Sequence, residues 1–528
     1  MPTPVSPTVL ADILTGYNNS IATYLVDGFT HGFRIGCYGL PAQINQYVRN
    51  LKSADEFPTI VDQKIAKELT LGRIIGPYDV PPSMHNFRVS PLGVVPKKVP
   101  GEFRTIHHLS YPEGSSINDF IPTEASSVQY ATIQDAINLI KHSGDQVFMA
   151  KVDIESAFRI IPVSPLDRPL LGFQWRGKFF MDAVLPMGCS SSCAIFERFS
   201  TALDWVARNK LGVSAVVHVI DDFLLIACSH MKCERDLQAF TNLCACLGVP
   251  LAPDKTVTPS RVITFLGITL DAERMEARLP NDKLEQAKTL LINFQRRYKV
   301  TLRELQSLAG VLNFACSVVP ARAFLRRLFD LTAGVLKPHH HIRLTSQAKL
   351  DLQVWHDFLC QYNGKSFFRD DNFLTGDFLQ LYTDAAGSIG FGALYGNEWF
   401  HGEWPVTWLS YNICVLELYP IMAAVAVWGS RWSNRSVCFY TDNEALVPAI
   451  NKQTARDHRI MALIRPLVLA CLRFNITFTA CHIPGRTNIL ADKLSRSQLQ
   501  EFRALAPWAD ANPQEIPFSV TPVSLGKL

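Results

Sequence analysis

The 528-residue sequence has no apolar run long enough to span a bilayer. Its longest runs, such as Ile421–Val427, stop well short of the roughly 20 residues that a transmembrane helix needs. The N-terminus also lacks the basic region and apolar core of a secretory signal. We therefore expect an intracellular protein of the cytoplasm or the nucleus, with no membrane partner.

Paired cysteines and an excess of one charge are also missing. The 13 cysteines lack the spacings of a zinc site or of a secreted disulfide framework, so we expect reduced thiols. The formal net charge is only +4, so nucleic-acid binding has to be inferred from individual sites. With 48% hydrophobic and 19% charged residues the chain is too apolar to be disordered, and its length suits about two to four domains.

Hydrophobic periodicity predicts a multi-domain chain of α+β class. Apolar runs on either side of Pro100 and Gly101 predict a hairpin within residues 89–109, and Thr301 and Glu304 have the spacing of a capping box. The other predicted elements before residue 320 are a buried strand at 146–154, a helix at 191–211, a hairpin at 214–227, a short strand at 261–270, and helices at 281–297 and 301–318. From Phe373 onward strands and helices alternate again, which predicts a second, separate α/β domain.

Two adjacent acids, Asp221 and Asp222, lie between the apolar runs of the predicted hairpin at 214–227. Alone, such a pair is more often a solvated turn, but within apolar runs it is unfavourable without a cation to neutralise it. Asp153 ends the predicted strand upstream. Two-metal phosphoryl transfer to a primer 3′-hydroxyl needs carboxylates on neighbouring rigid strands. If these strands pack side by side, the three acids form such a site.

Three ordered blocks around these acids resemble the palm of reverse transcriptases: VDIESAF at 152–158, LPMGCSSSCAIFERF at 185–199 and VIDDFLL at 219–225. The resemblance implies that Asp153, Asp221 and Asp222 are catalytic and bind Mg²⁺, two ions per site, with Mn²⁺ as an alternative. It also implies that Phe158 is the steric gate that excludes a ribose 2′-hydroxyl, so that dNTPs are selected.

The resemblance extends to the turn that touches the template base and the incoming nucleotide, which Met187 and Gly188 match. The chain departs from the family at Met187, where Gln is frequent, and at Val219, where Tyr is usual. Lys255 matches the palm lysine near the leaving pyrophosphate, which can act as a general acid. The segment Phe265–Ile268 resembles the hairpin that seats the primer end.

Upstream of the palm, the resemblance covers the basic hairpin of the fingers. Lys97, Lys98 and Arg104 match the residues that grip the triphosphate, where a planar Arg fork suits phosphate oxygens.

Four further acids, in the contexts TDAAG, LELYP, YTDNEA and HIPGRTNILADKLSR, resemble ribonuclease H in order over roughly residues 375–498. The resemblance implies that they are catalytic and hold two Mg²⁺ ions for hydrolysis of the RNA strand of a hybrid: Asp384, Glu417, Asp442 and Asp492. Many ribonucleases H carry a mobile His before the last acid. This chain has Arg486 there, with His482 earlier on a predicted strand.

Together the two resemblances imply a right-hand polymerase followed by an α/β ribonuclease H-like domain. The predicted domains are an N-terminal extension of unknown role at 1–75, fingers and palm at 76–270, a helical thumb-like region at 271–345, a connector at 346–372, the ribonuclease H-like domain at 373–500 and a tail at 501–528.

Two segments, RTIHHLSYPEGSSINDFI at 104–121 and VDGFTHGFRIG at 26–36, look like reverse transcriptases of the DIRS-like, tyrosine-recombinase retrotransposons. The implied function is RNA-directed DNA polymerase with ribonuclease H, serving retrotransposon replication. The implied partners are an RNA template, a DNA primer, an RNA–DNA hybrid, dNTPs, and the capsid-like and tyrosine recombinase proteins of the same element.

Three alternatives stay open. A viral RNA-dependent RNA polymerase shares the palm acids, although Phe158 and the second set of acids argue against it. A decayed or host-adopted product would bind nucleic acid without catalysis. In a third alternative only the ribonuclease H works, given the altered Met187 and Val219.

Overall fold

The computed structural model describes residues 1–40, 48–83, 87–97, 101–144, 146–362, 366–367, 379, 381–433, 435–526 and 528, with backbone only at 361–362 and 366–367. The chain is a mixed α/β structure that divides into two compact units, Met1–Met275 and Glu276–Leu528. The first unit ends close to the predicted boundary at residue 270, and the predicted boundary at 373 lies within the second unit.

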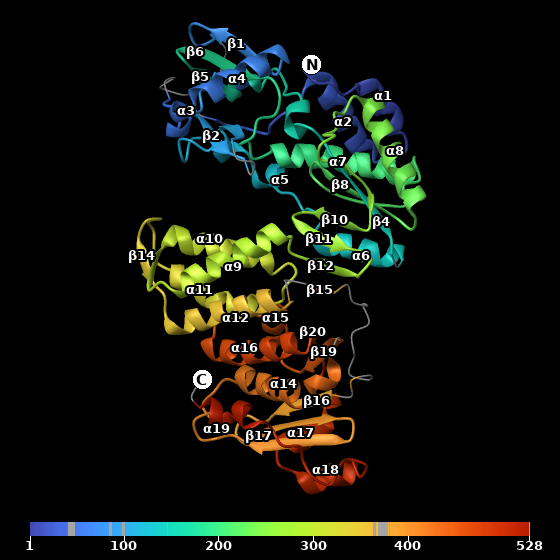
Figure 1. Ribbon diagram of the computed structural model, residues 1–528, viewed down its shortest axis with the longest axis vertical. Coiled ribbons are helices and arrows are strands. Elements are labelled where there is room, and N and C mark those ends of the chain that lie inside the picture. Colours follow the sequence, from blue (N-terminus) through green and yellow to red (C-terminus); the bar gives the residue numbers. More distant parts are fainter. Residues whose placement is uncertain are drawn as a thin grey trace. The chain divides into compact units, whose positions relative to one another are not determined.

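A four-stranded sheet is the centre of the first unit (Figure 1). Its strand order is β7-β8-β4-β9, made by Ala215–Val219, Asp222–Ala227, Phe148–Asp153 and Val257–Ser260. The predicted strand at 146–154 and the predicted hairpin at 214–227 are confirmed as β4 and as β7–β8.

Three helices pack against this sheet: α6 (Ile133–Ser143), α7 (Ser192–Asn209) and α8 (His230–Leu247). Val152 and Phe223 are register partners on β4 and β8, and both join Phe199 of α7 and Phe240 of α8 in one buried core. Because successive strand residues point to opposite faces, their neighbours Asp153 and Asp222 point away from this core. The predicted helix at 191–211 is confirmed as α7.

A smaller core supports the remaining strands of the first unit. Strands β1 (Ile74–Tyr78), β6 (Lys178–Asp182) and β5 (Gly172–Trp175) form a sheet in that order, and β2 (Leu92–Pro96) pairs with β3 (Phe103–His107). Helix α4 (Pro58–Thr70) contributes Val61 and Ile65 to the same core as Val94 and Phe173. The β2–β3 pair confirms the predicted hairpin at 89–109; Gly101 has a φ of +85° in its turn, and Pro100 lies outside the described residues.

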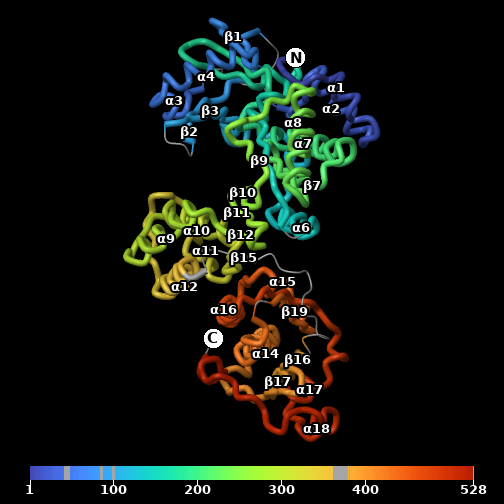
Figure 2. Tube along the Cα trace, turned by 45° about the vertical axis from the view of Figure 1, so that its right-hand side comes forward, coloured from blue at the N-terminus to red at the C-terminus, as the bar shows by residue number. Residues whose placement is uncertain are grey.

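The N-terminal residues pack on the first unit, where α1 (Pro7–Ile13) and α2 (Asn19–His31) lie beside α8 and α7 (Figures 1 and 2). The chain after α2 is held through its backbone: Phe33 N–H donates to Pro162 O, and Ile35 N–H donates to the buried carboxylate of Asp167. The short helices of this unit are α3 (Lys52–Glu56) and α5 (Thr123–Ser126).

Residues 261–270 were predicted as one strand, and this prediction is wrong in one respect. They form two antiparallel strands, β10 (Val262–Phe265) and β11 (Ile268–Asp271). The turn between them takes positive φ at Leu266 (+47°) and Gly267 (+76°). The single strand is therefore wrong, whereas the hairpin that the resemblance implied at Phe265–Ile268 is confirmed.

The second unit begins with helices α9 (Asn281–Gln295), α10 (Leu302–Ala315), α11 (Arg326–Thr332) and α12 (Ser346–Tyr362). Two pairs of short strands accompany these helices. Strand β12 (Glu276–Arg278), before α9, pairs with β15 (Ser366–Phe367), after α12, and β13 (Lys299–Thr301) pairs with β14 (His341–Arg343). The predicted helices at 281–297 and 301–318 are confirmed as α9 and α10, and Thr301 and Glu304 make the predicted capping box.

A second α/β layer structure follows. Strands β16 (Leu381–Ala385), β17 (Gly390–Tyr395) and β18 (Glu398–Glu403) are antiparallel, β19 (Ser436–Thr441) runs parallel to β20 (Thr477–His482), and β19 lies next to β16. Helix α14 (Ile413–Trp428) packs on one face, where Tyr419 contacts Phe391. Helix α17 (Ile489–Ser495) packs on the other, where Leu494 meets Gly392 (Figure 1). Helices α15 (Leu446–Asn451) and α16 (His458–Arg473) complete the layer.

Helix α14 and the 3₁₀ turn after it, Ile413–Trp432, are long and apolar enough by length and composition to cross a membrane. No apolar segment of this length was expected from the sequence, because Glu417 interrupts the apolar residues of the helix. In the fold, most of this segment is buried between α16 and strands β16 and β17. It is therefore the core helix of the second layer structure.

The C-terminal residues cover the aromatic side of this helix. Trp408 Nε1 donates to Gly526 O (2.7 Å), and Tyr419 Oη donates to Val520 O (3.1 Å). Helix α18 (Leu499–Leu505) places buried Phe502 against Trp399, and α19 (Pro522–Leu525) follows. The predicted boundary at residue 500 thus falls inside a helix.

Candidate active sites

The first acidic cluster, which consists of Asp153, Asp221 and Asp222, lies where β4 and β8 meet. Asp153 is the last residue of β4 and is the register partner of Asp222, the first residue of β8. Asp221 precedes Asp222 in the turn, and its backbone oxygen accepts from Ile154 N–H (2.9 Å). The side-by-side strands that the sequence predicted are therefore present, and they bring the three carboxyl-bearing residues to one end of the sheet.

Two lysines compensate the charge of this cluster. Lys255 Nζ lies 2.8 Å from Asp153 Oδ1, and Lys151 Nζ lies 3.0–3.1 Å from the two oxygens of Asp222. Lys151 was not singled out from the sequence, although its position two residues before Asp153 on β4 puts both side chains on the same face.

The carboxyl groups of the cluster are held in an environment that favours an added cation. Burial, with the charges of Asp153 and Asp222, raises the pKa of Asp221 to about 6. Burial also raises the pKa of Asp222, although Lys151 partly opposes this. Oxygen ligands from rigid strands with excess negative charge suit Mg²⁺ or Mn²⁺, so these residues fit a divalent ion.

The turn that carries Asp221 is fixed by side chains of α7. Ile220, just before it, has a φ of +55°, which is unfavourable for a β-branched residue. Its N–H donates to Glu197 Oε2 (2.9 Å), and its carbonyl accepts from Ser200 Oγ (2.6 Å). Both polar backbone groups of the strained residue are thereby held by one helix. None of these contacts was predicted, because nothing in the spacing of α7 points to them.

His218 of β7 reinforces the same contact. Its Nδ1 lies 2.9 Å from Asp204 Oδ2 and its Nε2 lies 3.3 Å from Glu197 Oε1. Burial lowers the pKa of His218, but the two carboxylates outweigh it and raise this pKa to about 9. The charged imidazolium therefore lies between the two acids of α7.

The residues predicted to contact the nucleotide lie close to this sheet. Phe158 lies in a 3₁₀ turn, Ala157–Ile160, with its ring 6.0 Å from that of Phe196 on α7. Met187 is 42% exposed. Gly188 has a φ of +122°, and a Cβ there would lie 2.0 Å from His107 O. The close backbone approach predicted for Gly188 is therefore present, and its neighbour is strand β3.

The predicted basic residues of the hairpin β2–β3 differ in their surroundings. Lys97 Nζ pairs with Glu102 Oε2 (2.9 Å), whereas Arg104 is an exposed residue of β3. Lys98 lies outside the described residues. Lys97 and Arg104 are both exposed, and Lys97 is the one of the two that pairs with an acid.

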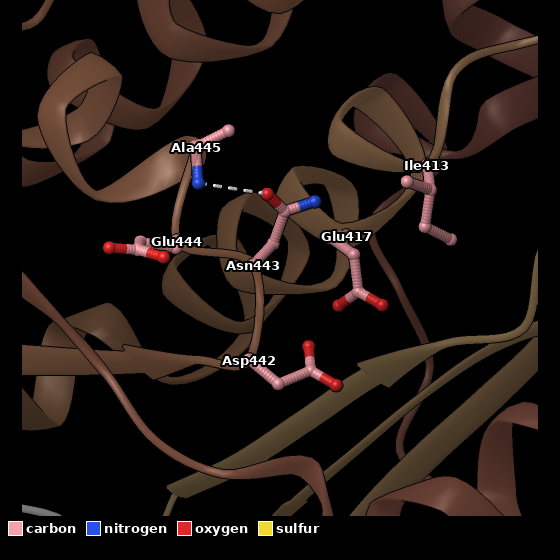
Figure 3. Close-up of a pocket in the computed structure, with 6 residues that line it drawn as sticks. All are labelled: Ile413, Glu417, Asp442, Asn443, Glu444 and Ala445. Carbon is pink, nitrogen blue, oxygen red and sulfur yellow. Dashed lines mark hydrogen bonds between the residues drawn. The ribbon is translucent and has the colours of Figure 1, made fainter.

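The second acidic cluster gathers Asp384, Glu417 and Asp442. Each of these three residues offers one carboxylate oxygen, and the three oxygens lie within 4.8 Å of one another. Asp384 is on β16, Glu417 is on α14 and Asp442 follows β19, so three separate elements converge as the sequence analysis expected. In Figure 3 the carboxylates of Glu417 and Asp442 point toward each other, whereas Glu444 points away.

Asp492, the fourth predicted acid, lies on α17 and is not one of the three converging residues, but its charge acts on Asp384. Its Oδ1 accepts from Arg496 Nε (2.7 Å). From the same helix, the hydroxyl of Ser495 donates to Asp384 Oδ2. Ser495 was missed from the sequence, because a serine in a helix gives no signal of its partner.

Burial and mutual repulsion dominate the electrostatics of the second cluster. Burial, with the charges of Asp384 and Asp442, raises the pKa of Glu417 to about 9. Burial likewise raises the pKa of Asp384, to which Asp442 and Asp492 contribute, although Ser495 partly opposes this. Three converging carboxylate oxygens with this excess charge fit a divalent cation.

An open hollow of about 630 Å³ leads to the second cluster, and Ile413 and Asn443 lie at its rim (Figure 3). Arg486 is exposed in the loop after β20, and His482 is exposed at the end of that strand. A Cβ at Gly485 would lie 2.9 Å from Asp442 Oδ2, so this loop runs directly beside the cluster.

A family model for reverse transcriptase (RNA-dependent DNA polymerase) matches residues 95–270, which contain the whole first acidic cluster. These residues form a reverse transcriptase domain. The domain is of the type found in retroviruses and retrotransposons.

Curated relatives of the reverse transcriptase domain are viral polyproteins. The Gag-Pro-Pol polyprotein of human T-cell leukemia virus 3 (strain 2026ND) is 24% identical over 316 residues, which cover 58% of this chain and 20% of the polyprotein. That of simian retrovirus SRV-2 is 25% identical over 220 residues, which cover 39% of this chain and 11% of the polyprotein. The chain thus spans a fifth or less of the length of these two relatives.

Solved structures with the same fold include the foamy viral protease-reverse transcriptase. Its complex with an RNA/DNA hybrid aligns with a TM-score of 0.53 and 15% identity, covering 90% of this chain and 62% of that one. Its dRH form in complex with ds DNA aligns with a TM-score of 0.52 and 17% identity, covering 90% of this chain and 81% of that one. The likeness extends the shared fold beyond the reverse transcriptase domain.

Proposed function

We propose that this chain is an RNA-directed DNA polymerase that transfers dNTPs to a primer 3′-hydroxyl by a two-metal mechanism. The observation that carries the proposal is the register pairing of Asp153 with Asp222, with Asp221 in the adjoining turn, inside a reverse transcriptase domain. Its substrates would be dNTPs on a DNA primer annealed to an RNA template.

Each residue of the first cluster has a distinct role in this proposal. Asp153 and Asp221 would hold two Mg²⁺ ions, with Mn²⁺ as an alternative, and Asp222 adds negative charge beside them. The ions would lower the pKa of the 3′-hydroxyl and offset the charge on the triphosphate. Lys255, already 2.8 Å from Asp153, can donate a proton to the leaving pyrophosphate. The Phe158 ring would exclude a ribose 2′-hydroxyl.

The experiment is Mg²⁺-dependent dNTP incorporation on an oligo(dT)-primed RNA template. We expect incorporation by the wild type and its loss in a folded Asp221→Asn variant, with rNTPs used far less well than dNTPs. Equal use of rNTPs would favour an RNA-dependent RNA polymerase. No incorporation by a well-folded wild type with either Mg²⁺ or Mn²⁺ would overturn the proposal.

The second cluster supports a second activity, hydrolysis of the RNA strand of an RNA–DNA hybrid. Three carboxylate oxygens within 4.8 Å of one another favour it, because they can hold divalent ions that activate a water molecule. Asp492 would be the fourth ligand beside Asp384, Glu417 and Asp442. We expect the wild type to cleave the RNA strand of a labelled hybrid. The Asp442→Asn variant should lose this cleavage and retain polymerase activity. Binding of the hybrid without cleavage would leave a binding role.

In this proposal the two activities serve the replication of a retrotransposon, because copying RNA leaves a hybrid whose RNA strand has to be removed. The segments 104–121 and 26–36 favour a DIRS-like lineage. The capsid-like and tyrosine recombinase proteins of such an element would then be partners of this chain. Co-purification of this chain with each candidate protein tests this.

A further inference from the structure

Asp182, the last residue of β6, is the centre of a buried charged network in the reverse transcriptase domain. Its side chain is 7% exposed. Its Oδ1 lies 2.7 Å from Arg159 Nη1, and its Oδ2 lies 3.1 Å from His107 Nδ1. Each oxygen of one carboxylate thus contacts a different cation-forming side chain, and these two side chains come from separate elements.

Arg159 connects this carboxylate to the predicted gate. It directly follows Phe158 in the 3₁₀ turn Ala157–Ile160. Its guanidinium also contacts Glu68 of α4 (2.9 Å), and Nη1 lies 3.5 Å from Leu185 O. The planar fork of an arginine can bridge two carboxylates in fixed directions, which a lysine cannot do. The backbone at Phe158 is therefore anchored from its neighbouring residue.

His107 connects the same carboxylate to the nucleotide-contacting turn. It ends strand β3, and its Nε2 lies 3.1 Å from Gly172 O, so both ring nitrogens are engaged. Its backbone N–H donates to Met187 O (3.1 Å), and its carbonyl faces Gly188 so closely that a Cβ would lie 2.0 Å away. Movement of His107 would therefore move the turn directly.

The two branches of the network meet on one short segment, Leu185–Gly188. Arg159 approaches the carbonyl of Leu185 and His107 holds the carbonyl of Met187, so the contacts lie on either side of Pro186. Asp182 orients both side chains. Burial alone would raise the pKa of Asp182, but Arg159 and His107 outweigh it and leave this pKa below its usual value, so the carboxylate is charged.

We propose that Asp182 is a positioning residue that, through Arg159 and His107, fixes the Leu185–Gly188 turn and the Phe158 ring for selection of the incoming nucleotide. The proposal rests on the proposed polymerase function. Replacing a buried ion pair with apolar residues often leaves stability unchanged, so stability alone does not account for this network. Displacement of a substrate-positioning group by about 1 Å can cost about 10²-fold in rate.

The test compares Asp182→Ala and Asp182→Asn with the wild type in single-nucleotide incorporation on an RNA template. We expect Asp182→Ala to raise KM for dNTP roughly tenfold and to weaken dNTP-over-rNTP selection, with a smaller change in kcat. Asp182→Asn keeps two polar atoms in place, so it should restore part of both properties. If Asp182→Ala does not fold, Asp182→Asn alone should still show a smaller rise in KM.

Asp236→Ala is the matched control. Asp236 is also a buried aspartate of the first unit, at 2% exposure, and it holds Ser214 N–H and Lys232 without contacting the turn. The Asp236→Ala variant should have a lower stability, with KM for dNTP and dNTP-over-rNTP selection unchanged. The proposal would be overturned if the folded Asp182 variants kept the KM for dNTP and the dNTP-over-rNTP selection of the wild type. An equal rise in KM in Asp236→Ala would also overturn it.

Hydrogen exchange separates this proposal from the polymerase assignment. Backbone amides of residues 183–190 should exchange faster in Asp182→Ala, whereas those of β4 should not. If the wild type incorporates no nucleotide, the polymerase assignment fails by itself. Unchanged exchange at 183–190 in the variant would then overturn the positioning role independently.

Discussion

Asp153 and Asp222 face each other across the β4–β8 pair, and each contacts its own lysine. The two lysines are not equivalent. The Lys255 side chain is 56% exposed, whereas that of Lys151 is 18% exposed and lies on the same strand as Asp153. Asp222 is therefore the more firmly neutralised of the two acids, which leaves Asp153 and Asp221 as the more available ligands for a cation.

This difference predicts a ranking of variants. Asp153→Asn and Asp221→Asn should each lower kcat of nucleotide incorporation by about 10²-fold or more, because each removes a charged ligand of the proposed metal ions. Asp222→Asn should cost less, since Lys151 already neutralises it. Steady-state incorporation at saturating Mg²⁺ measures the ranking, and an Asp222→Asn loss larger than the other two would contradict it.

A second prediction concerns the strained turn. Glu197→Ala leaves Ile220 N–H without its acceptor, so we expect a several-fold higher Mg²⁺ concentration for half-maximal incorporation. Glu197→Gln retains an acceptor oxygen and should restore most of the affinity. Asp204→Asn weakens the contact with His218 but leaves the acceptor of Ile220 N–H in place, so it should raise the Mg²⁺ requirement less than Glu197→Ala does.

The pH dependence of stability provides a third prediction. The pKa of His218 is about 9 in the folded chain, above the value of 6.5 that a histidine has in the unfolded chain. A raised pKa stabilises the fold fully below pH 6.5, and this contribution is lost as pH rises through about 9. We expect the loss to be about 3 kcal/mol in the free energy of unfolding of the first unit, because each pKa unit corresponds to about 1.4 kcal/mol. Urea unfolding at pH 6 and pH 9.5 measures it, and His218→Gln should show a smaller difference between the two.

Metal removal gives a fourth prediction, for the second unit. Burial of Glu417, together with repulsion from Asp384 and Asp442, destabilises this unit at neutral pH without a cation, as the raised pKa of Glu417 indicates. Adding Mg²⁺ after EDTA treatment should therefore raise its melting temperature at pH 7.5 by several degrees. Glu417→Gln should raise the melting temperature without Mg²⁺ and reduce the further gain. A Mg²⁺ effect of wild-type size in this variant would count against metal binding at Glu417.

Much of this arrangement follows from local sequence patterns. The β7–β8 hairpin could be predicted because two apolar, β-branched runs flank its acid pair, and α7 could be predicted because its helical periodicity is a local property. The convergence of Asp384, Glu417 and Asp442 could be anticipated only through the order of their motifs. The contacts of Glu197 with Ile220 and of Asp182 with Arg159 and His107 could not, because they join residues whose side chains carry no pattern of their own. Strand β18 was missed because its Trp399 and Phe400 do not alternate with polar residues.

Under the proposed function, the close approach of His107 O to Gly188 limits which substitutions in this turn can change nucleotide selection. No L-amino acid fits at position 188 without displacing the end of β3, whereas the neighbouring Met187 is 42% exposed and free to vary. Under selection by a nucleotide analogue, resistance should therefore arise at Met187 and not at Gly188. The departure of Met187 from the glutamine frequent in the family lies at this permissive position.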